Sequence, residues 1–244
     1  MYNTKYSNLG ETDYKEAWDY QESLFDSVVA IKLHNRDNPE SQKEMLHHLL
    51  FVEHPHVFTL GKSGAPANLL ITDELLEKIG AKFYRINRGG DITYHGPGQV
   101  VGYPIFDLEA MNLGIKEYIH LLEEAIIITL LHYGINGARL DGATGVWLDV
   151  NDPQKARKIC AIGVRASRFV SMHGFALNVN TNLDYFRYIN PCGFIDKGVT
   201  SLQNELNRPI PLAEIHEHLP VLRHHARHVA EHALHQGIPI RDPA

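Results

Sequence analysis

FYRINRGGDITYHGPGQVVGYPIF, residues 83–106, is the stretch that says most about the fold of this chain. Its two ends, 83–86 and 100–106, are apolar and rich in aromatic and β-branched residues, as buried strands usually are. The segment between them, 88–99, is dense in glycine and proline, and glycine lets a backbone approach a ligand closely. A polar loop held between two buried strands predicts a binding site. The alternative is a long structural turn, and the Gly-Lys-Ser/Thr ending of a phosphate-binding loop is missing.

The composition indicates one globular domain. Its 244 residues, 44% of them hydrophobic, fit a single catalytic-sized domain over 1–244, with a core at about 45–210 and a polar helical C-terminal tail. The formal net charge of −6 argues against a nucleic-acid partner. No apolar run reaches the roughly 18 residues of a membrane span, and the polar N-terminus lacks the apolar segment of a signal peptide. We therefore expect a cytoplasmic protein with no membrane partner, and its two cysteines are too few for a disulfide framework.

Helices and strands alternate along the chain. Apolar residues at helical spacing predict a helix from about 14 to 28 and a long buried helix from about 115 to 130. Thr72 or Asp73 is a suitable cap for a short helix between them. The predicted strands are 49–52, 57–60, 83–86, 100–106, 144–150, 158–166 and 169–179, the last two possibly forming a hairpin. The predicted fold class is therefore α+β, with a mixed, largely antiparallel sheet flanked by helices.

The two cysteines lie in different contexts. Cys160 is inside the apolar run 159–162, where a thiol is usually structural and inert. Cys192 lies between Pro191 and Gly193, in a tight turn that would expose its thiol enough to react. From this context alone, a functional and a structural role for Cys192 are about equally compatible with the sequence.

Lys158 opens a predicted strand on its apolar side. Alternate residues of a strand share a face, so Lys158 would point the same way as Cys160 and Ile162. A lysine there is unusual unless it is paired. Its side chain either escapes to water from the first residue of the strand or enters a pocket. In a pocket it could lower the pKa of a thiol by its charge or shuttle a proton.

Histidines repeat at helical spacing near the C-terminus, as His224, His228 and His232. One such helix face could bind a metal ion weakly. A catalytic zinc usually needs a third fixed ligand, and no His-Glu-x-x-His motif is present. We interpret these histidines as a solvated helix face and expect no metal.

Six separated motifs, taken in order, resemble the lipoyl(octanoyl) transferase family. This family moves an octanoyl group from acyl carrier protein to a lysine of lipoyl domains. The motifs lie at 54–61, at 88–99 with the strand that follows, at 144–147, at 158–163, at 173–179 and at 190–193. They span about residues 50–205, and the resemblance implies the fold of the biotin and lipoate protein ligases.

The resemblance implies a role for each motif. Cys192 would be the acyl-thioester nucleophile, and Lys158 would lower the pKa of its thiol. The substrate-binding residues would be Arg88, Gly89, Gly90, Asp91, Ile92, Thr93, Tyr94, His95, Ala161, Ile162, Gly163, Gly174, Phe175 and Ala176.

The resemblance also implies the partners. The donor would be octanoyl-acyl carrier protein, and the acceptors would be the lipoyl domains of 2-oxoacid dehydrogenases and the glycine cleavage H protein. Neither ATP nor another cofactor would be required. Because these partners are generally acidic, we expect the basic segment of Lys155, Arg157, Arg165 and Arg168 to form a docking rim; an ordinary solvated strand is the alternative.

Three positions depart from the family pattern. Gln is common where Asp91 stands, a small residue is usual at Cys160, and Leu is usual at Phe175.

Two other functions remain open. An ATP-dependent lipoate or biotin ligase of the same fold would need an adenylate site and no nucleophilic cysteine. The second alternative function is that of an acyl-binding module without catalytic activity.

Overall fold

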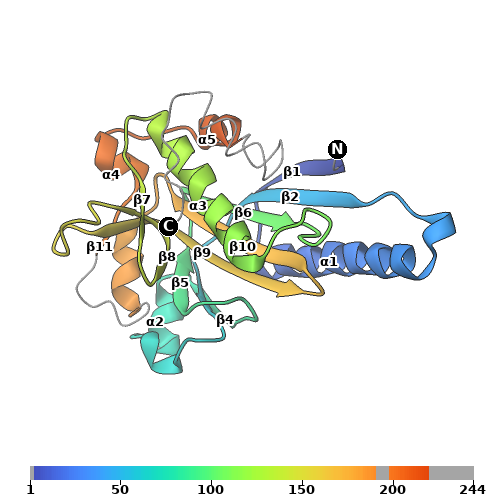
Figure 1. The fold of residues 1–244 in the computed structure, drawn as a ribbon. Coiled ribbons are helices and arrows are strands. Elements are labelled where there is room, and N and C mark those ends of the chain that lie inside the picture. Colours follow the sequence, from blue (N-terminus) through green and yellow to red (C-terminus); the bar gives the residue numbers. More distant parts are fainter. Residues whose placement is uncertain (1–2, 191–197, 220–244) are drawn as a thin grey trace.

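The computed structural model describes residues 3–190 and 198–219, which form two β-sheets and the helices packed on them (Figure 1). The strands are β1 (Asn3–Glu11), β2 (Leu46–Glu53), β3 (Val57–Leu60), β4 (Lys82–Arg85), β5 (Ile92–His95), β6 (Gln99–Ile105), β7 (Ala138–Leu140), β8 (Ala143–Leu148), β9 (Arg157–Ser167), β10 (Val170–Asn178) and β11 (Gly198–Val199). The α-helices are α1 (Tyr14–Asp37), α2 (Asp73–Lys78), α3 (Ile115–Leu131), α4 (Leu202–Leu206) and α5 (Leu212–His218). Short 3₁₀ helices cover Pro39–Ser41, Pro66–Asn68 and Leu183–Tyr188.

The larger sheet runs in the order β1-β2-β6-β10-β9-β8-β7, and β11 pairs with β9. The β1–β2 and β11–β9 pairs are parallel, and the remaining pairs of this sheet are antiparallel. The predicted class, a mixed and largely antiparallel sheet flanked by helices, is confirmed.

Side-chain alternation along the central strands separates the two faces of this sheet. In β2, Leu49 and Phe51 pack in a core with α3, whereas Leu50 and Val52 pack in a second core with α1. This is the period of two expected for a strand that is buried on both sides. The α1 and α3 helices therefore cover opposite faces, and the molecule has a helix–sheet–helix arrangement (Figure 1).

The smaller sheet has the order β4-β3-β5. Phe58, Ile92 and Tyr94 pack in its own core, together with Leu76 of α2. Thr72 caps α2 by accepting a hydrogen bond from the backbone N–H of Leu75, as the sequence predicts. This sheet carries the Gly-rich segment, residues 88–99, to β9 of the larger sheet.

Several elements differ from the sequence-based expectation, among them the short β7, β11 and α4, which the sequence did not predict. The segment between the two predicted strands is not loop throughout, because Ile92–His95 forms β5 and pairs antiparallel with β3. The strand β1 is also additional, because its polar sequence NTKYSNLGE lacks the apolar alternation that marks a strand. The part of the predicted polar tail beyond residue 219 lies outside the described residues, and so does His224 with its neighbouring histidines.

Candidate active site

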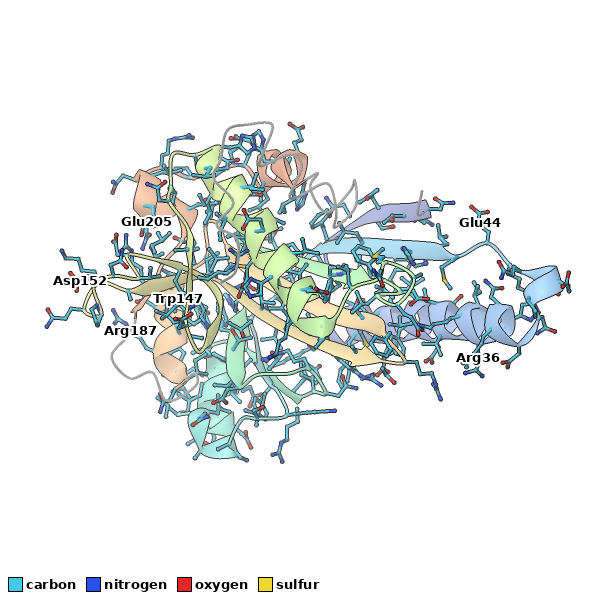
Figure 2. All side chains as sticks on the ribbon, in the orientation of Figure 1. Arg36, Glu44, Trp147, Asp152, Arg187 and Glu205 are labelled. Carbon is cyan, nitrogen blue, oxygen red and sulfur yellow. The ribbon has the colours of Figure 1, made fainter. Side chains whose placement is uncertain are left out.

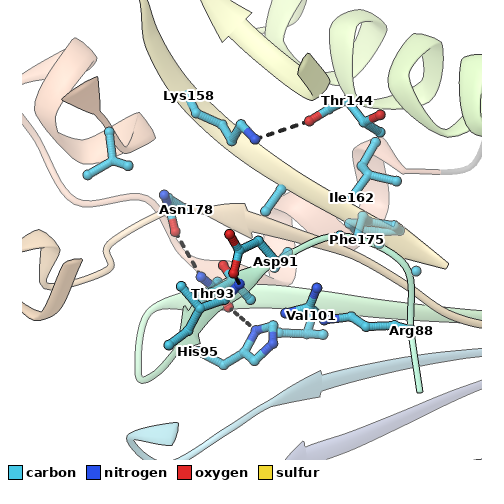
Figure 3. A pocket seen from close by; sticks show the side chains of 18 of the residues that line it. Arg88, Asp91, Thr93, His95, Val101, Thr144, Lys158, Ile162, Phe175 and Asn178 are labelled. Carbon is cyan, nitrogen blue, oxygen red and sulfur yellow. Dashed lines mark hydrogen bonds between the residues drawn. The ribbon is translucent and has the colours of Figure 1, made fainter. Parts of the chain in front are cut away.

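A cavity of about 370 Å³ lies between the larger sheet and the segment that carries β5 (Figure 3). Strands β6, β9 and β10 supply one wall, including the apolar side chains of Val101, Ile162 and Phe175. Thr144 and Lys158 lie at the β8–β9 side, as the close-up shows. Its volume lies within the range of small-molecule sites, which are typically apolar with a few placed polar groups.

Arg88 anchors the Gly-rich segment rather than projecting freely into the cavity. Its Nη2 donates to the Thr59 carbonyl at 2.8 Å and to the Thr59 hydroxyl at 3.0 Å. Its Nη1 donates to the Gly89 carbonyl at 2.9 Å. The next residue ties the segment to β9, because the Gly89 N–H donates to the Val164 carbonyl. The guanidinium thus fixes the segment to β3, and the Gly89 N–H joins it to β9 of the larger sheet.

A chain of hydrogen bonds crosses the floor of the site. His95 Nδ1 lies 2.8 Å from Gln99 Oε1, and Gln99 Nε2 donates to Asn178 Oδ1 at 2.9 Å. Asn178 Nδ2 then donates to the Thr200 carbonyl at 3.0 Å. Because Gln99 Oε1 accepts, the proton of the neutral His95 ring is on Nδ1. The chain fixes the relative positions of β5, β6 and β10 and of the segment that follows β11.

Three buried imidazoles surround this floor in neutral form. Burial lowers the pKa of His95 to about 3, with a further contribution from the positive charge on a protonated His54. Burial likewise lowers the pKa of His54 to about 4 and that of His173 to about 3. At neutral pH these rings are therefore uncharged hydrogen-bonding groups, and the site gains no cation from them.

Lys158, the second residue of β9, lines the cavity. Its Nζ donates to the Thr144 carbonyl at 3.1 Å (Figure 3). It also lies 4.6 Å from the centre of the Trp147 ring. A cation within about 6 Å of an aromatic face is attracted by the ring. Of the two positions left open for this side chain, water or pocket, the structure shows the one on the pocket wall.

The strand pairing beside Lys158 is irregular. Trp147 pairs with Lys158, but the preceding β8 residue, Val146, pairs with Cys160, so β9 advances two residues while β8 advances one. A bulge of this kind re-aims side chains. The irregular register interrupts the simple alternation between Lys158 and Cys160. Lys158 lines the cavity, whereas Cys160 is fully buried in the core with α3.

Asp91 has a structural role in the Gly-rich segment. One carboxylate oxygen accepts from the backbone N–H of Ile92 at 2.6 Å, and the other accepts from Asn68 Nδ2 at 2.7 Å. The carboxylate therefore fixes the start of β5 while it lines the cavity. These contacts give a physical reason for an acid at this position.

The structure brings most of the expected substrate-binding residues to one cavity. Those that line it are Arg88, Gly90, Asp91, Ile92, Thr93, His95, Ala161, Ile162, Gly163, Gly174, Phe175 and Ala176, together with Lys158. Gly89 and Tyr94 do not. Tyr94 turns to the core of the smaller sheet, where its hydroxyl lies 2.7 Å from His56 Nδ1. Cys192 lies outside the described residues.

Several lining residues come from positions that sequence reasoning did not connect with the site. Tyr14 comes from α1, Tyr103 from β6, His173 from β10 and Trp147 from β8. Tyr103 and Trp147 lie inside motifs of the resemblance, which is a signal that could have found them. Tyr14 carries no such signal, because in the sequence it is one apolar position of an amphipathic helix.

The other cysteine is unsuited to react. Cys160 is fully buried, and burial raises the pKa of its thiol well above the ordinary value. A buried thiol in apolar surroundings stays protonated and is a poor nucleophile. This agrees with the structural role expected of Cys160 from its sequence context.

The expected docking rim contains an arginine that is already paired. Arg157 donates to the Glu205 carboxylate through Nε and Nη2, both at 2.7 Å, and also pairs with Asp149. Asp152 and Glu205 lie at this end of the molecule, far from Arg36 and Glu44 (Figure 2). Lys155 lies 3.3 Å from Asp152. The acidic neighbours offset much of the local positive charge, so this end of β9 is less basic than its sequence indicates.

Within residues 3–190 and 198–219, no group of three or more His, Cys, Asp or Glu side chains is arranged to hold a metal ion. None of the helices in the same ranges is both long and apolar enough to cross a membrane.

One family model covers most of this chain. Residues 13–220 match the model of the lipoyl protein ligase A/B catalytic domain. A protein named octanoyltransferase from Bacteroides fragilis is 58% identical over 206 residues, which cover 84% of this chain and 90% of that protein. Another octanoyltransferase, from Flavobacterium psychrophilum, is 61% identical over 199 residues, covering 82% and 85%.

Solved structures of lipoate protein ligases share the fold. A bipartite lipoate protein ligase from Thermoplasma acidophilum matches with a TM-score of 0.64 at 14% identity, covering all of both chains. A lipoate-protein ligase A bound with ATP matches with a TM-score of 0.62 at 16% identity, covering 97% of this chain and 95% of that one. At such identities the likeness concerns the fold, and it confirms the predicted resemblance to lipoate ligases. With the family model matched over residues 13–220 and relatives above 50% identity, this chain belongs to the lipoyl protein ligase A/B catalytic-domain family.

Proposed function

We propose that this chain is an acyltransferase that moves an octanoyl group to the lysine of a lipoyl domain, a step of protein lipoylation. The observation that carries the proposal is the identity of 58–61% to proteins named octanoyltransferase along more than four fifths of the chain. The donor that we propose is octanoyl-acyl carrier protein. The acceptors are the lipoyl domains of 2-oxoacid dehydrogenases and the glycine cleavage H protein.

The cavity suits an acyl chain. Val101, Ile162 and Phe175 give it an apolar wall, and the polar groups lie around Arg88 and His95. Burying a methylene group is worth about 0.8 kcal/mol, so the methylenes of an octanoyl chain would contribute up to about 5 kcal/mol of binding free energy. The chain length of the preferred substrate follows from how much of this wall the acyl group covers.

The first half-reaction that we propose forms an acyl-enzyme. The thiolate of Cys192 attacks the carbonyl carbon of the donor thioester, the carbon–sulfur bond to the carrier breaks, and the carrier leaves as a thiolate that takes up a proton. Only a few per cent of an ordinary thiol is ionised at pH 7. The ammonium of Lys158, on the cavity wall, favours the thiolate by its positive charge.

The second half-reaction regenerates the enzyme. The neutral amine of the acceptor lysine attacks the octanoyl-Cys192 carbonyl carbon, the bond to Cys192 sulfur breaks, and the nitrogen loses a proton as the amide forms. Transfer from a thioester to an amide is energetically downhill. The two half-reactions balance without ATP.

The backbone of β9 offers donors for the oxyanion that forms in both steps. Residues 161–163 pair with β10 on one side. On their other side the pairing with β8 ends at Cys160, and Ala161, Ile162 and Gly163 line the cavity. Preorganised N–H groups at such an edge stabilise a developing negative charge.

The transfer can be tested with purified components. The chain is mixed with octanoyl-acyl carrier protein and an unmodified lipoyl domain, without nucleotide and with a chelator, and the mass of the lipoyl domain is followed. We expect one octanoyl group on the domain and none on a control domain whose target lysine is replaced by arginine. Transfer only when ATP and magnesium are supplied would instead identify a ligase. Failure in both conditions would leave the silent acyl-binding module.

A further inference from the structure

A buried carboxylate lies behind the cavity wall and takes no part in lining it. Glu123, on α3, is 5% exposed. Its Oε1 accepts from the backbone N–H of Gly145 at 3.0 Å, and its Oε2 accepts from Arg139 Nε at 3.0 Å. A buried carboxylate is costly unless its oxygens are satisfied, so both contacts are needed to keep it inside.

The Glu123 contact and the Lys158 contact use the two ends of one peptide group. The Gly145 N–H that donates to Glu123 and the Thr144 carbonyl that accepts from Lys158 Nζ belong to the same planar unit. In a trans peptide these two groups point in opposite directions. Fixing the N–H end therefore fixes the direction of the carbonyl that receives the ammonium.

This peptide group has little freedom to be held in another way. Gly145 has a φ of +118°, and a Cβ there would lie 2.5 Å from the Cys160 carbonyl oxygen. Gly145 lies inside β8, beside the irregular pairing of β8 with β9. Regular strand pairing would otherwise fix this peptide group. Here the Glu123 carboxylate on α3 fixes it through the Gly145 N–H.

Restraining the ammonium has a chemical consequence. The Thr144 carbonyl and the Trp147 ring both attract the Lys158 cation. A free lysine side chain has about 2 kcal/mol of rotamer entropy, so its charge is spread over many positions unless something restrains it. A restrained ammonium exerts its electrostatic effect from one position.

We propose that Glu123 is a positioning residue for Lys158, acting through the Thr144–Gly145 peptide group. The inference rests on the proposed function, because it assumes that Lys158 activates the thiol of Cys192. Glu123 itself touches no substrate and acts only on the direction of the Thr144 carbonyl.

Two variants of Glu123 separate the effect of side-chain length from the effect of charge. Glu123→Asp keeps the negative charge but shortens the side chain by one carbon–carbon bond, roughly 1.5 Å, so it loses the Gly145 N–H. Glu123→Gln loses the charge but keeps an oxygen at the right distance. Glu124→Gln is the matched control, because Glu124 also accepts from Arg139, at 2.7 Å, but does not bind Gly145.

The readouts are the pH dependence of Cys192 alkylation, resolved by peptide mass, and amide exchange at Gly145. We expect Glu123→Asp to move the alkylation midpoint to higher pH, in the direction of Lys158→Met, and to speed exchange at Gly145. The kcat for transfer at pH 7 should fall by about tenfold while KM for the donor changes little. Glu124→Gln should behave like the unaltered protein. Glu123→Gln should keep the alkylation midpoint and the protection of the Gly145 amide, although its NH2 group no longer accepts from Arg139 and its stability should fall.

The outcomes distinguish the inference from the function on which it rests. If Lys158→Met moves the midpoint but Glu123→Asp does not, the positioning role of Glu123 is wrong and the role of Lys158 stands. If Lys158→Met moves nothing, the role of Lys158 is wrong, and the inference falls with it. Should Glu123→Asp not fold, fast exchange of the Gly145 amide in the unaltered protein would overturn the inference, and strong protection there and in Glu123→Gln would support it.

Discussion

At the residue scale, Lys158 and the three imidazoles around the cavity floor have different electrostatic roles. Burial keeps His54, His95 and His173 uncharged, so they hold the floor together by hydrogen bonds. Lys158 supplies positive charge at the wall. An ammonium about 4 Å from a thiolate, at an effective dielectric near 20, is worth roughly 4 kcal/mol, which sets an upper limit of about 3 units on the lowering of a thiol pKa.

Replacing Lys158 by methionine removes this charge and keeps most of the side-chain volume. We expect the pKa of Cys192, measured from the pH dependence of its alkylation rate, to rise towards the ordinary thiol value near 8.5. Transfer should slow most at low pH, where the thiolate becomes scarce. An alkylation profile identical to that of the unaltered protein would show that Lys158 has no electrostatic effect on the thiol.

His54 makes stability depend on pH. Its folded pKa is about 4, below the ordinary value of 6.5, so below neutral pH the unfolded chain binds more protons than the folded one. The contribution of His54 to stability is therefore complete above about pH 6.5 and is lost as the pH falls towards 4. Between pH 7 and pH 5 the loss is about 2 kcal/mol of unfolding free energy.

The measurement is urea unfolding at both pH values. His54→Gln should be less stable at pH 7 but lose about 2 kcal/mol less than the unaltered protein on going to pH 5. The same change at His120, which is exposed, is the control and should leave the difference between the two pH values unaltered. An equal loss in all three proteins would mean that His54 does not titrate on unfolding.

At the scale of single elements, β10 places one large side chain against the cavity. Phe175 is 2% exposed, and its ring lies over Gly102 of β6, where even a Cβ atom would overlap it. This pair sets how far the apolar wall extends.

Phe175→Leu should leave space over Gly102 and favour longer acyl chains. One methylene in an apolar pocket is worth about 1–3 kcal/mol of discrimination, so we expect the kcat/KM ratio of dodecanoyl to octanoyl donors to rise by at least about tenfold. Leu177→Val, a loss of volume on the same strand but outside the cavity, is the control. An unchanged ratio in Phe175→Leu would remove Phe175 from the determinants of chain length.

The same elements show how much of the fold the sequence could predict. Apolar runs such as those of β2, β6 and β10 predict strands well, because burial and strand period act on neighbouring residues. The polar β1 strand depends on its parallel pairing with β2, about forty residues away in the chain, and no local pattern reveals that. The irregular β8–β9 pairing at Lys158 is likewise a relation between two strands, so alternation along one strand could not predict it.

At the scale of the whole molecule, the site exists because two sheets meet. His95 of the smaller sheet reaches Asn178 and the backbone of Thr200 through Gln99, joining segments that are far apart in sequence. Motifs can nominate such residues one at a time. Their convergence, and the exclusion of Tyr94 from the cavity in favour of its contact with His56, follow only from the folded structure.

Net charge also acts on the whole molecule. With −6 overall, and with Arg157 paired to Glu205 and Asp149, the chain offers less free positive charge for acidic partners than its basic segment indicates. Arg157 instead joins β9 to α4. A docking surface for the carrier, if built on this segment, must rely on residues other than Arg157.

In the proposed mechanism the octanoyl group passes through Cys192. The most direct measurement mixes the chain with octanoyl-acyl carrier protein in the absence of any acceptor or nucleotide, then maps the adduct by peptide mass spectrometry. We expect one octanoyl group, on Cys192, that hydroxylamine removes and that an added lipoyl domain takes up. An adduct on Cys160, or transfer to the lipoyl domain by a Cys192→Ala variant at the unaltered rate, would contradict it.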